Sequence, residues 1–273
     1  MKRAIGFLGG QYGDIVTTIA AQKIFKEDFP NYKLTLAASF KFKEILPIFK
    51  GQDFVNDIHI WQGYDESWPT DADLRFIKDN EYKIIFNPMQ GVGDGLWFNR
   101  IHQVSLCCER YGLRLPESNQ VSLQKKFLEN SDYKNTIFLS VFPNNGQGVK
   151  AMSMKNAISL TDILKKEQNK VYQISGPHDP QIPNVDRVIK VSFLEILPII
   201  ANCKLLITGD TSICWIASTL EVKTLGLFAR GCHPNSINSK NWQPINPNAI
   251  YLEADNVNNI NLDKIVTEVK NLI

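Results

Sequence analysis

The second half of the chain carries a run of polar residues suited to bind phosphate. An apolar strand predicted at residues 205–208 runs into Gly-Asp-Thr-Ser at residues 209–212, and a short helix follows. A second apolar strand, residues 224–228, ends before a turn rich in Gly, His, Pro and Asn. In open α/β sheets ligands bind at the carboxyl ends of strands, and the N–H groups of a helix N-terminus suit phosphate. The sequence therefore predicts a site for a phosphorylated ligand here.

A second candidate lies near the beginning of the chain. Asp14 follows Gly13 directly and precedes a helix predicted at residues 15–26. A carboxylate there could take the proton from a bound hydroxyl as a general base. It could equally be the N-cap of the helix, accepting a backbone N–H group. Both roles can hold at once, because a capping position also presents its carboxylate to a cleft.

The loop that contains Asp14 resembles a dinucleotide fingerprint only in part. A Gly-x-Gly-x-x-Gly frame that ends on Gly10 and Gly13 requires glycine at position 8, where Leu8 stands. The second strand should also end near an acidic residue for the ribose, and residues 33–40 contain none. We therefore expect no nicotinamide or flavin cofactor.

Composition indicates the class of protein and demands neither a nucleic-acid nor a membrane partner. A chain of 273 residues with 44% hydrophobic and 21% charged residues fits a soluble globular protein of two domains. The net charge of +2 does not indicate a nucleic-acid partner. The five cysteines form no Cys-x-x-Cys pair, so we expect reduced thiols in the cytoplasm and no metal site. No apolar run reaches the roughly 20 residues of a membrane span.

One segment leaves a peripheral membrane contact open. Residues 40–43 and 46–50 mix lysines with bulky apolar side chains. The segment could rest on the inner membrane, or it could form an ordinary helix whose lysines are solvated, and we favour the second interpretation.

Predicted strands and helices alternate through both halves of the chain. Such alternation predicts an α/β protein with parallel sheets covered by helices on both faces. A polar segment without periodicity, residues 116–132, is the expected linker between domains at 1–125 and 126–273. The expected strands are 3–8, 33–38, 57–60, 83–87, 136–141, 171–175, 205–208, 224–228 and 249–252. The expected helices are 15–26, 43–49, 99–111, 156–166, 193–200 and 262–273.

Several segments resemble the heptosyltransferase family, glycosyltransferase family 9. Residues 10–18, Gly-Gln-Tyr-Gly-Asp-Ile-Val-Thr-Thr, and residues 29–35 resemble the family's opening. Residues 102–116 match a further family segment, and residues 192–203 resemble the helix before the nucleotide site. Residues 209–217 resemble the site itself. The segments stand in family order and cover most of the chain.

The resemblance implies a GT-B fold, with two Rossmann-like domains whose parallel sheets face a central cleft. The first domain would bind the acceptor, a glycan or lipid-linked glycan such as lipopolysaccharide core. The second would bind a nucleotide diphosphate-sugar donor, an ADP-linked heptose in the family's usual reaction. The implied reaction is sugar transfer with inversion and without a metal ion or cofactor.

The chemistry of that reaction assigns roles to individual residues. Inverting transfer needs a base, and Asp14 would serve. It also needs positive charge or N–H groups for the departing diphosphate, and Lys150 is the candidate cation. A lysine in a Gly-rich loop is also typical of a solvated surface, and Lys155 is a neighbouring alternative. The residues expected at the donor are Asp179, Asp210, Thr211, Ser212, Trp215 and His233. Those expected at the acceptor are Gln11, Gly13, Asp94 and Trp97.

Most of these residues also have a purely structural interpretation. Asp179 would be a turn aspartate, Asp210 a helix cap, and His233 a surface histidine. Asp94 and Trp97, in the Gly-rich stretch 89–98, could hold a sugar or belong to a hairpin with one buried aromatic ring.

The chain departs from the family pattern at Ser212, where glycine is usual, and at Trp215, where histidine is usual. Trp215 lies off the apolar stripe predicted for residues 213, 216, 217 and 220, so its ring could stack on a base or sugar, or fill space by packing, the interpretation we favour. Two alternatives follow: a glycosyltransferase for another acceptor, including modified nucleic acid, or a catalytically silent nucleotide-sugar-binding protein.

Overall fold

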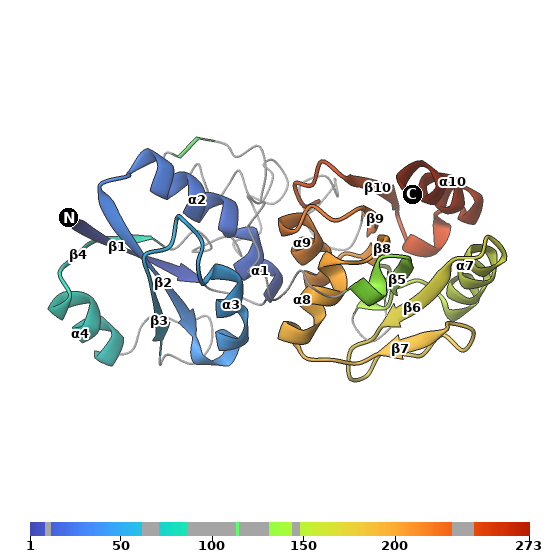
Figure 1. Ribbon diagram of the computed structural model, residues 1–273, viewed down its shortest axis with the longest axis horizontal. Coiled ribbons are helices and arrows are strands. Elements are labelled where there is room, and N and C mark those ends of the chain that lie inside the picture. Colours follow the sequence, from blue (N-terminus) through green and yellow to red (C-terminus); the bar gives the residue numbers. More distant parts are fainter. Residues whose placement is uncertain (9–11, 62–70, 87–112, 115–130, 144–147, 231–242) are drawn as a thin grey trace. The chain divides into compact units, whose positions relative to one another are not determined.

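The computed structural model describes residues 1–8, 12–61, 71–86, 113–114, 131–143, 148–230 and 243–273. The chain divides into two compact units, Met1–Gln124 and Lys125–Ile273, here called the N-terminal and C-terminal units (Figure 1). Each unit is built around a parallel sheet with helices packed against it. The predicted α/β class with two parallel sheets is confirmed. The predicted helix 99–111 lies outside the described residues, as does all but the end of the predicted linker.

In the sheet of the N-terminal unit, the order in which strands are added reverses beside the first strand, β1. The sheet's spatial order is β3-β2-β1-β4, and all the neighbouring pairs are parallel. The chain therefore adds strands on one side of β1 and then returns to its other side, which makes a topological switch point between β1 and β4. The strands are β1 (Lys2–Leu8), β2 (Tyr32–Ser39), β3 (Asp57–Trp61) and β4 (Tyr82–Phe86).

The helix predicted at residues 15–26 is two helices in the structure. They are α1 (Tyr12–Thr17) and α2 (Ile19–Asp28), separated at Thr18. The Thr17 hydroxyl donates to the Gly13 carbonyl at 2.9 Å, and the Thr18 hydroxyl donates to the Ile15 carbonyl at 2.8 Å. Hydroxyls that bond back to preceding carbonyls compete with the helix ladder and bend it. The break is therefore a local effect of two consecutive threonines.

Gly6 allows α2 to approach the sheet of the N-terminal unit closely. A Cβ atom at Gly6 would lie 2.4 Å from Oε1 of Gln22, a fully buried residue of α2. The opposite face carries a separate apolar cluster of Ile5, Phe7, Ala37, Trp61 and Ile77. Ile77 belongs to α4 (Asp71–Asp79), a helix that the sequence did not predict. Two layers of helix therefore enclose β1, the strand that leads to Asp14.

The segment that mixes lysines with apolar residues is mostly core. It forms a 3-10 helix, η1 (Phe40–Ile45), and α3 (Leu46–Phe49). Phe42, Ile48 and Phe49 are buried, whereas Phe40 is 56% exposed. Burial thus accounts for most of the apolar residues that suggested a membrane contact. Among the described residues, no helix is both long and apolar enough to span a bilayer.

The sheet of the C-terminal unit has its switch point in the middle. Its spatial order is β10-β9-β8-β5-β6-β7, with parallel pairing throughout. The chain runs outward from β5 to β7 and then crosses to β8, on the other side of β5. The strands are β5 (Thr136–Ser140), β6 (Lys170–Ile174), β7 (Arg187–Ile189), β8 (Leu205–Gly209), β9 (Thr224–Ala229) and β10 (Ala249–Ala254).

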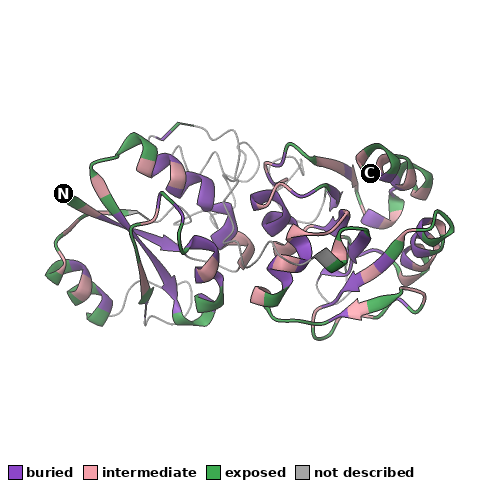
Figure 2. Ribbon diagram, viewed as in Figure 1, coloured by how far each residue is buried: buried purple, intermediate pink, exposed green. Residues whose placement is uncertain are grey.

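Two pairs of helices cover this sheet. Helices α7 (Met154–Lys166) and α10 (Leu262–Leu272) contact each other, and α8 (Phe193–Ala201) contacts α9 (Ser212–Thr219) (Figure 1). Alternate residues of β5 show two buried faces: Ile137 and Leu139 belong to the cluster with α7 and α10, and Phe138 points the other way. The central strands β5 and β8 are buried along their length, except that Ser140 at the end of β5 is partly exposed (Figure 2). This rigid centre fixes the carboxyl ends of β5 and β8.

Candidate active site

Lys150 and Asp210 meet at the switch point of the C-terminal unit. The Nζ atom of Lys150 lies 2.6 Å from Oδ2 of Asp210 in an ion pair. Lys150 follows β5 and Asp210 follows β8, and these strands are neighbours in the sheet. The two side chains are only 18% and 12% exposed. The structure thus brings together two residues that the sequence assigned to one ligand.

The loop that carries Lys150 rests directly on the end of β8. A Cβ atom at Gly209 would lie 3.2 Å from Cγ of Pro143 and 3.4 Å from the carbonyl oxygen of Lys150. A Cβ atom at the last position of β8 would crowd Pro143, and glycine avoids this tight contact. The loop turns at Gly148, whose φ of +76° is a conformation that other residues rarely adopt. Both glycines contribute to the position of the Lys150 ammonium.

Thr211 and Ser212 begin helix α9 next to this ion pair. Thr211 is the N-cap in an extended conformation, and its side chain makes no capping hydrogen bond. Its hydroxyl instead lies 3.3 Å from that of Thr208. A helix N-terminus presents N–H groups and a partial positive charge. An anion bound there would lie beside the Lys150 ammonium.

Trp215 is a packing residue of α9, and the predicted apolar stripe is wrong in detail. Trp215 is 5% exposed, and its neighbour Cys214 is 1% exposed. Ile213 and Leu220, predicted to be core, are only partly buried. The helix has eight residues and is buried around most of its circumference, so a single stripe does not describe it. Stacking of Trp215 on a ligand stays a prediction.

Asp179 closes a turn after β6. Its Oδ2 accepts the Gly176 N–H at 2.6 Å. A Cβ atom at Gly176 would come within 3.2 Å of this carboxylate, so the turn is tight. Because β6 is the neighbour of β5, the turn lies at the same edge of the sheet as the Lys150 loop. In the structure Asp179 is therefore a turn residue, and its contact with a ribose remains a prediction.

Asp14 lies within the first turn of α1, so its predicted role as an N-cap is wrong. The helix begins at Tyr12, two residues earlier than Asp14, and Gly13 lies inside it. A short helix after β1 places the partly exposed Asp14 at the switch point of the N-terminal unit. The Tyr12 ring packs edge-on against Phe42 at 5.1 Å between centroids. Burial raises the pKa of Tyr12, and the Glu44 carboxylate adds to the shift.

Several predicted residues cannot be placed, and one basic residue was overlooked. Gln11, Asp94, Trp97 and His233 lie outside the described residues. Arg230, which the sequence argument passed over, follows β9 and pairs with Asp255 at 3.1 Å. The signal was available, because a basic residue directly after an apolar strand next to β8 falls at the ligand edge of the sheet. Lys155 is exposed and lies in the first turn of α7.

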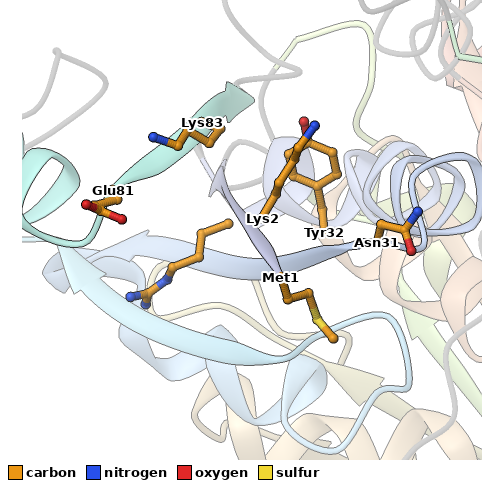
Figure 3. Close-up of a pocket in the computed structure, with 7 residues that line it drawn as sticks. Met1, Lys2, Asn31, Tyr32, Glu81 and Lys83 are labelled. Atoms are coloured by element: carbon orange, nitrogen blue, oxygen red, sulfur yellow. The ribbon is translucent and has the colours of Figure 1, made fainter.

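A cavity of about 670 Å³ lies at the end of the N-terminal unit's sheet that is opposite to Asp14. Its lining comes from the amino-terminal ends of β1, β2 and β4 (Figure 3). Lys2, Tyr32 and Lys83 are part of that lining. Asp14 follows the carboxyl end of β1, so the cavity is separate from the candidate site. Within the described part of the chain, no group of three His, Cys, Asp or Glu residues could hold a metal ion.

Known structures share this fold over nearly the whole chain. A glycosyl transferase of family 9 from Veillonella parvula superimposes with a TM-score of 0.78 at 12% identity, covering 99% of this chain and 97% of its own. The E. coli heptosyltransferase WaaC with ADP gives 0.72 at 12% identity, covering 99% and 100%. The fold is that of the heptosyltransferases. The E. coli ADP-heptose lps heptosyltransferase II gives 0.68 at 12% identity, covering 100% and 98%.

The motif resemblance is too weak to appear in a search with family models or curated sequences. No protein-family model matches the chain, and no curated protein matches it in sequence. The heptosyltransferase fold therefore confirms the predicted GT-B class of two Rossmann-like units. At 12% identity it establishes the fold, and the activity has to be argued from the residues.

Proposed function

We propose that this protein is a glycosyltransferase that moves a sugar from a nucleoside diphosphate donor to a hydroxyl of a glycan acceptor. One observation carries the proposal: the Lys150–Asp210 pair lies beside the N-terminus of α9, at the switch point of the C-terminal unit. Switch points are where open α/β sheets bind nucleotides. The likeness in fold to glycosyltransferases supports the proposed class of reaction.

The C-terminal unit would bind the donor through its diphosphate. The ammonium of Lys150 and the N–H groups at Thr211 and Ser212 would stabilise the negative charge that develops as the sugar–phosphate bond breaks. This arrangement supplies charge without a metal ion, and we propose metal-independent transfer. WaaC is described with ADP and with ADP-2-deoxy-2-fluoro heptose, so we propose an ADP-linked heptose or related sugar as the donor.

The N-terminal unit would bind the acceptor near Asp14. A carboxylate that accepts the proton of the acceptor hydroxyl makes this oxygen a nucleophile, and a single displacement inverts the anomeric carbon. We propose a surface glycan such as lipopolysaccharide core as the acceptor. The free thiols Cys203 and Cys214 suit a reducing cytoplasm. The exposed Phe40 and the adjacent lysines would be the point of any contact with the inner membrane.

Nucleotide binding tests this proposal first. Thermal unfolding is measured with ADP, GDP, UDP and their sugar conjugates, for the wild type, Lys150→Ala and Asp14→Asn. A ligand that binds only the folded state raises the unfolding temperature by mass action. We expect a shift with one diphosphate that Lys150→Ala weakens and Asp14→Asn preserves. A folded wild type that responds to no nucleotide would refute the proposal.

Turnover separates an enzyme from a silent binding protein, the alternative that the departure at Trp215 suggested. The donor that binds is incubated with candidate acceptors, and the release of nucleoside diphosphate is followed. We expect Asp14→Asn to bind the donor normally and to lose transfer by at least about a hundredfold. Binding without any release of diphosphate, with or without acceptor, would favour the silent protein.

A further inference from the structure

The loop that carries Lys150 is held by a segment that lies close to it in space but far along the sequence of the C-terminal unit. That segment is η5 (Val257–Asn259) with Asn256 before it. The N–H of Val257 donates to the carbonyl of Val149 at 2.9 Å, and Nδ2 of Asn258 donates to the carbonyl of Ala151 at 3.0 Å. The residues on both sides of Lys150 are thus fixed by two hydrogen bonds from a segment more than a hundred positions away.

The side-chain amide of Asn258 uses its full hydrogen-bonding capacity in this contact. Its Oδ1 accepts from the Ser153 N–H at 2.5 Å and from Nδ2 of Asn156 at 3.4 Å. Its Nδ2 donates to Ala151 and, at 3.0 Å, to Oδ1 of Asn256. Two donors and two acceptors match the inventory of a carboxamide. An aspartate at this position has the same shape but no N–H groups, so it could still accept from Ser153 and Asn156 but could not donate to Ala151 or Asn256.

Apolar contacts anchor the same two segments. Met152 and Val257 are each 2% exposed, and both belong to the core cluster that underlies α7 and α10. The Met152 N–H also donates to the carbonyl of Val141 at 3.0 Å. Core packing therefore holds the loop at Met152, and the Asn258 side chain holds the backbone at Ala151 and Ser153, on either side of it.

We infer that Asn258 is a positioning residue for Lys150: its amide fixes the loop so that the ammonium stands beside Asp210 and can receive the donor diphosphate. This inference rests on the proposed function of Lys150. Asn258 acts through the backbone at Ala151 and Ser153, so its effect on a ligand should depend on the Lys150 side chain. An ordinary structural asparagine would affect binding whether or not Lys150 is present.

A double-mutant cycle tests this dependence. The dissociation constant of whichever diphosphate binds the wild type best, of ADP, GDP and UDP, is measured calorimetrically for wild type, Asn258→Asp, Lys150→Ala and the double variant. We expect Asn258→Asp to weaken binding at least about tenfold, because one charge-assisted contact is misplaced. In the Lys150→Ala background the same substitution should have almost no further effect.

A matched control separates positioning from general destabilisation. Asn261 also accepts a backbone N–H through its side chain, from Asp263 at 2.7 Å, and it caps α10. Asn261→Ala should lower the unfolding temperature and leave the dissociation constant unchanged. If Asn258→Asp does not fold, Asn258→Ala replaces it in the cycle, since it removes the bonds without introducing a charge.

The outcomes separate a failure of the positioning role of Asn258 from a failure of the proposed function. Wild-type affinity in Asn258→Asp, or an equal loss with and without the Lys150 side chain, overturns the positioning role and leaves the proposed function intact. A wild type that binds none of the three diphosphates shows instead that the proposed function has failed, and the positioning role with it.

Discussion

Asp210 lies 60 residues from Lys150 in the chain and 2.6 Å from it in the structure. Each of these opposite charges is largely removed from water. A largely buried charge without a partner is costly, so each side chain restricts the other to one position. The cation proposed to bind the diphosphate is therefore already in place before the ligand arrives.

Removing one charge of this pair should cost more than removing both. Lys150→Met leaves the Asp210 carboxylate without that ammonium, and we expect the free energy of unfolding to fall by about 1–3 kcal/mol. Adding Asp210→Asn should restore part of the loss. Urea unfolding of both single variants and the double variant measures the coupling. Strictly additive losses would contradict a direct interaction.

Gly209→Ala should displace the Lys150 loop. The added methyl group would lie only 3.2 Å from Cγ of Pro143, in the same loop, so Pro143 would have to shift by a few tenths of an ångström. We expect diphosphate affinity to fall about tenfold or more, since the ammonium moves with its backbone. Gly226→Ala is the control: its methyl group would meet the Tyr251 ring at 2.4 Å and should reduce stability. If both variants alter affinity equally, the close approach at Gly209 has no special role.

Gln22→Met should stabilise the N-terminal unit. Gln22 is fully buried, and neither of its side-chain polar atoms has a hydrogen-bond partner among the described residues. Replacing an unpaired buried amide with an apolar group of similar shape should gain about 1–2 kcal/mol.

Gln173 provides the matched comparison in the C-terminal unit. It is equally buried, but its amide donates to the Pro180 carbonyl and accepts the Ile182 N–H. Gln173→Met should therefore destabilise the protein by about 1–3 kcal/mol. Unfolding curves of the two variants, recorded under the same conditions, should shift in opposite directions.

The thiol of Cys214 should resist alkylation in the native protein. Burial raises its pKa well above the ordinary value, and the Asp210 carboxylate raises it further. The neutral thiol is thus favoured in the folded state, and the stability that this contributes is lost as the pH rises above the pKa of the unfolded thiol. Iodoacetamide at pH 8, followed by peptide mass mapping, should modify Cys214 only after unfolding. Rapid native labelling would contradict the packing of α9.

The sequence predicted the elements with strong periodicity and missed the short ones. Strands with continuous apolar residues, such as β8, and the amphipathic helix α10 were predicted within a few residues. β7 has three residues, too few to show a pattern, and α4 buries Asp73 as well as Ile77. Two threonine hydroxyls divide the predicted first helix, an effect that periodicity does not contain.

The candidate site was predicted residue by residue, but its contacts were not. Sequence order indicated that Lys150 and Asp210 follow strands, and only the spatial order of the sheet makes those strands neighbours. Trp215 was predicted to lie off the apolar stripe, with packing as the favoured interpretation, and it is buried because sheet and helices enclose α9 on more than one face. Asn258 gave no local signal, because Ala151, the residue to which its side chain donates, lies more than a hundred positions away.

The contact between Asn258 and Ala151 also has a consequence for how nucleotide binding should be lost when the protein unfolds. A loop held by residues so distant in sequence cannot persist as a local structure when the surrounding sheet melts. Denaturant should therefore abolish nucleotide affinity in the same cooperative transition that exposes the core of the C-terminal unit. Ligand binding and the integrity of that unit would then be two measurements of a single equilibrium.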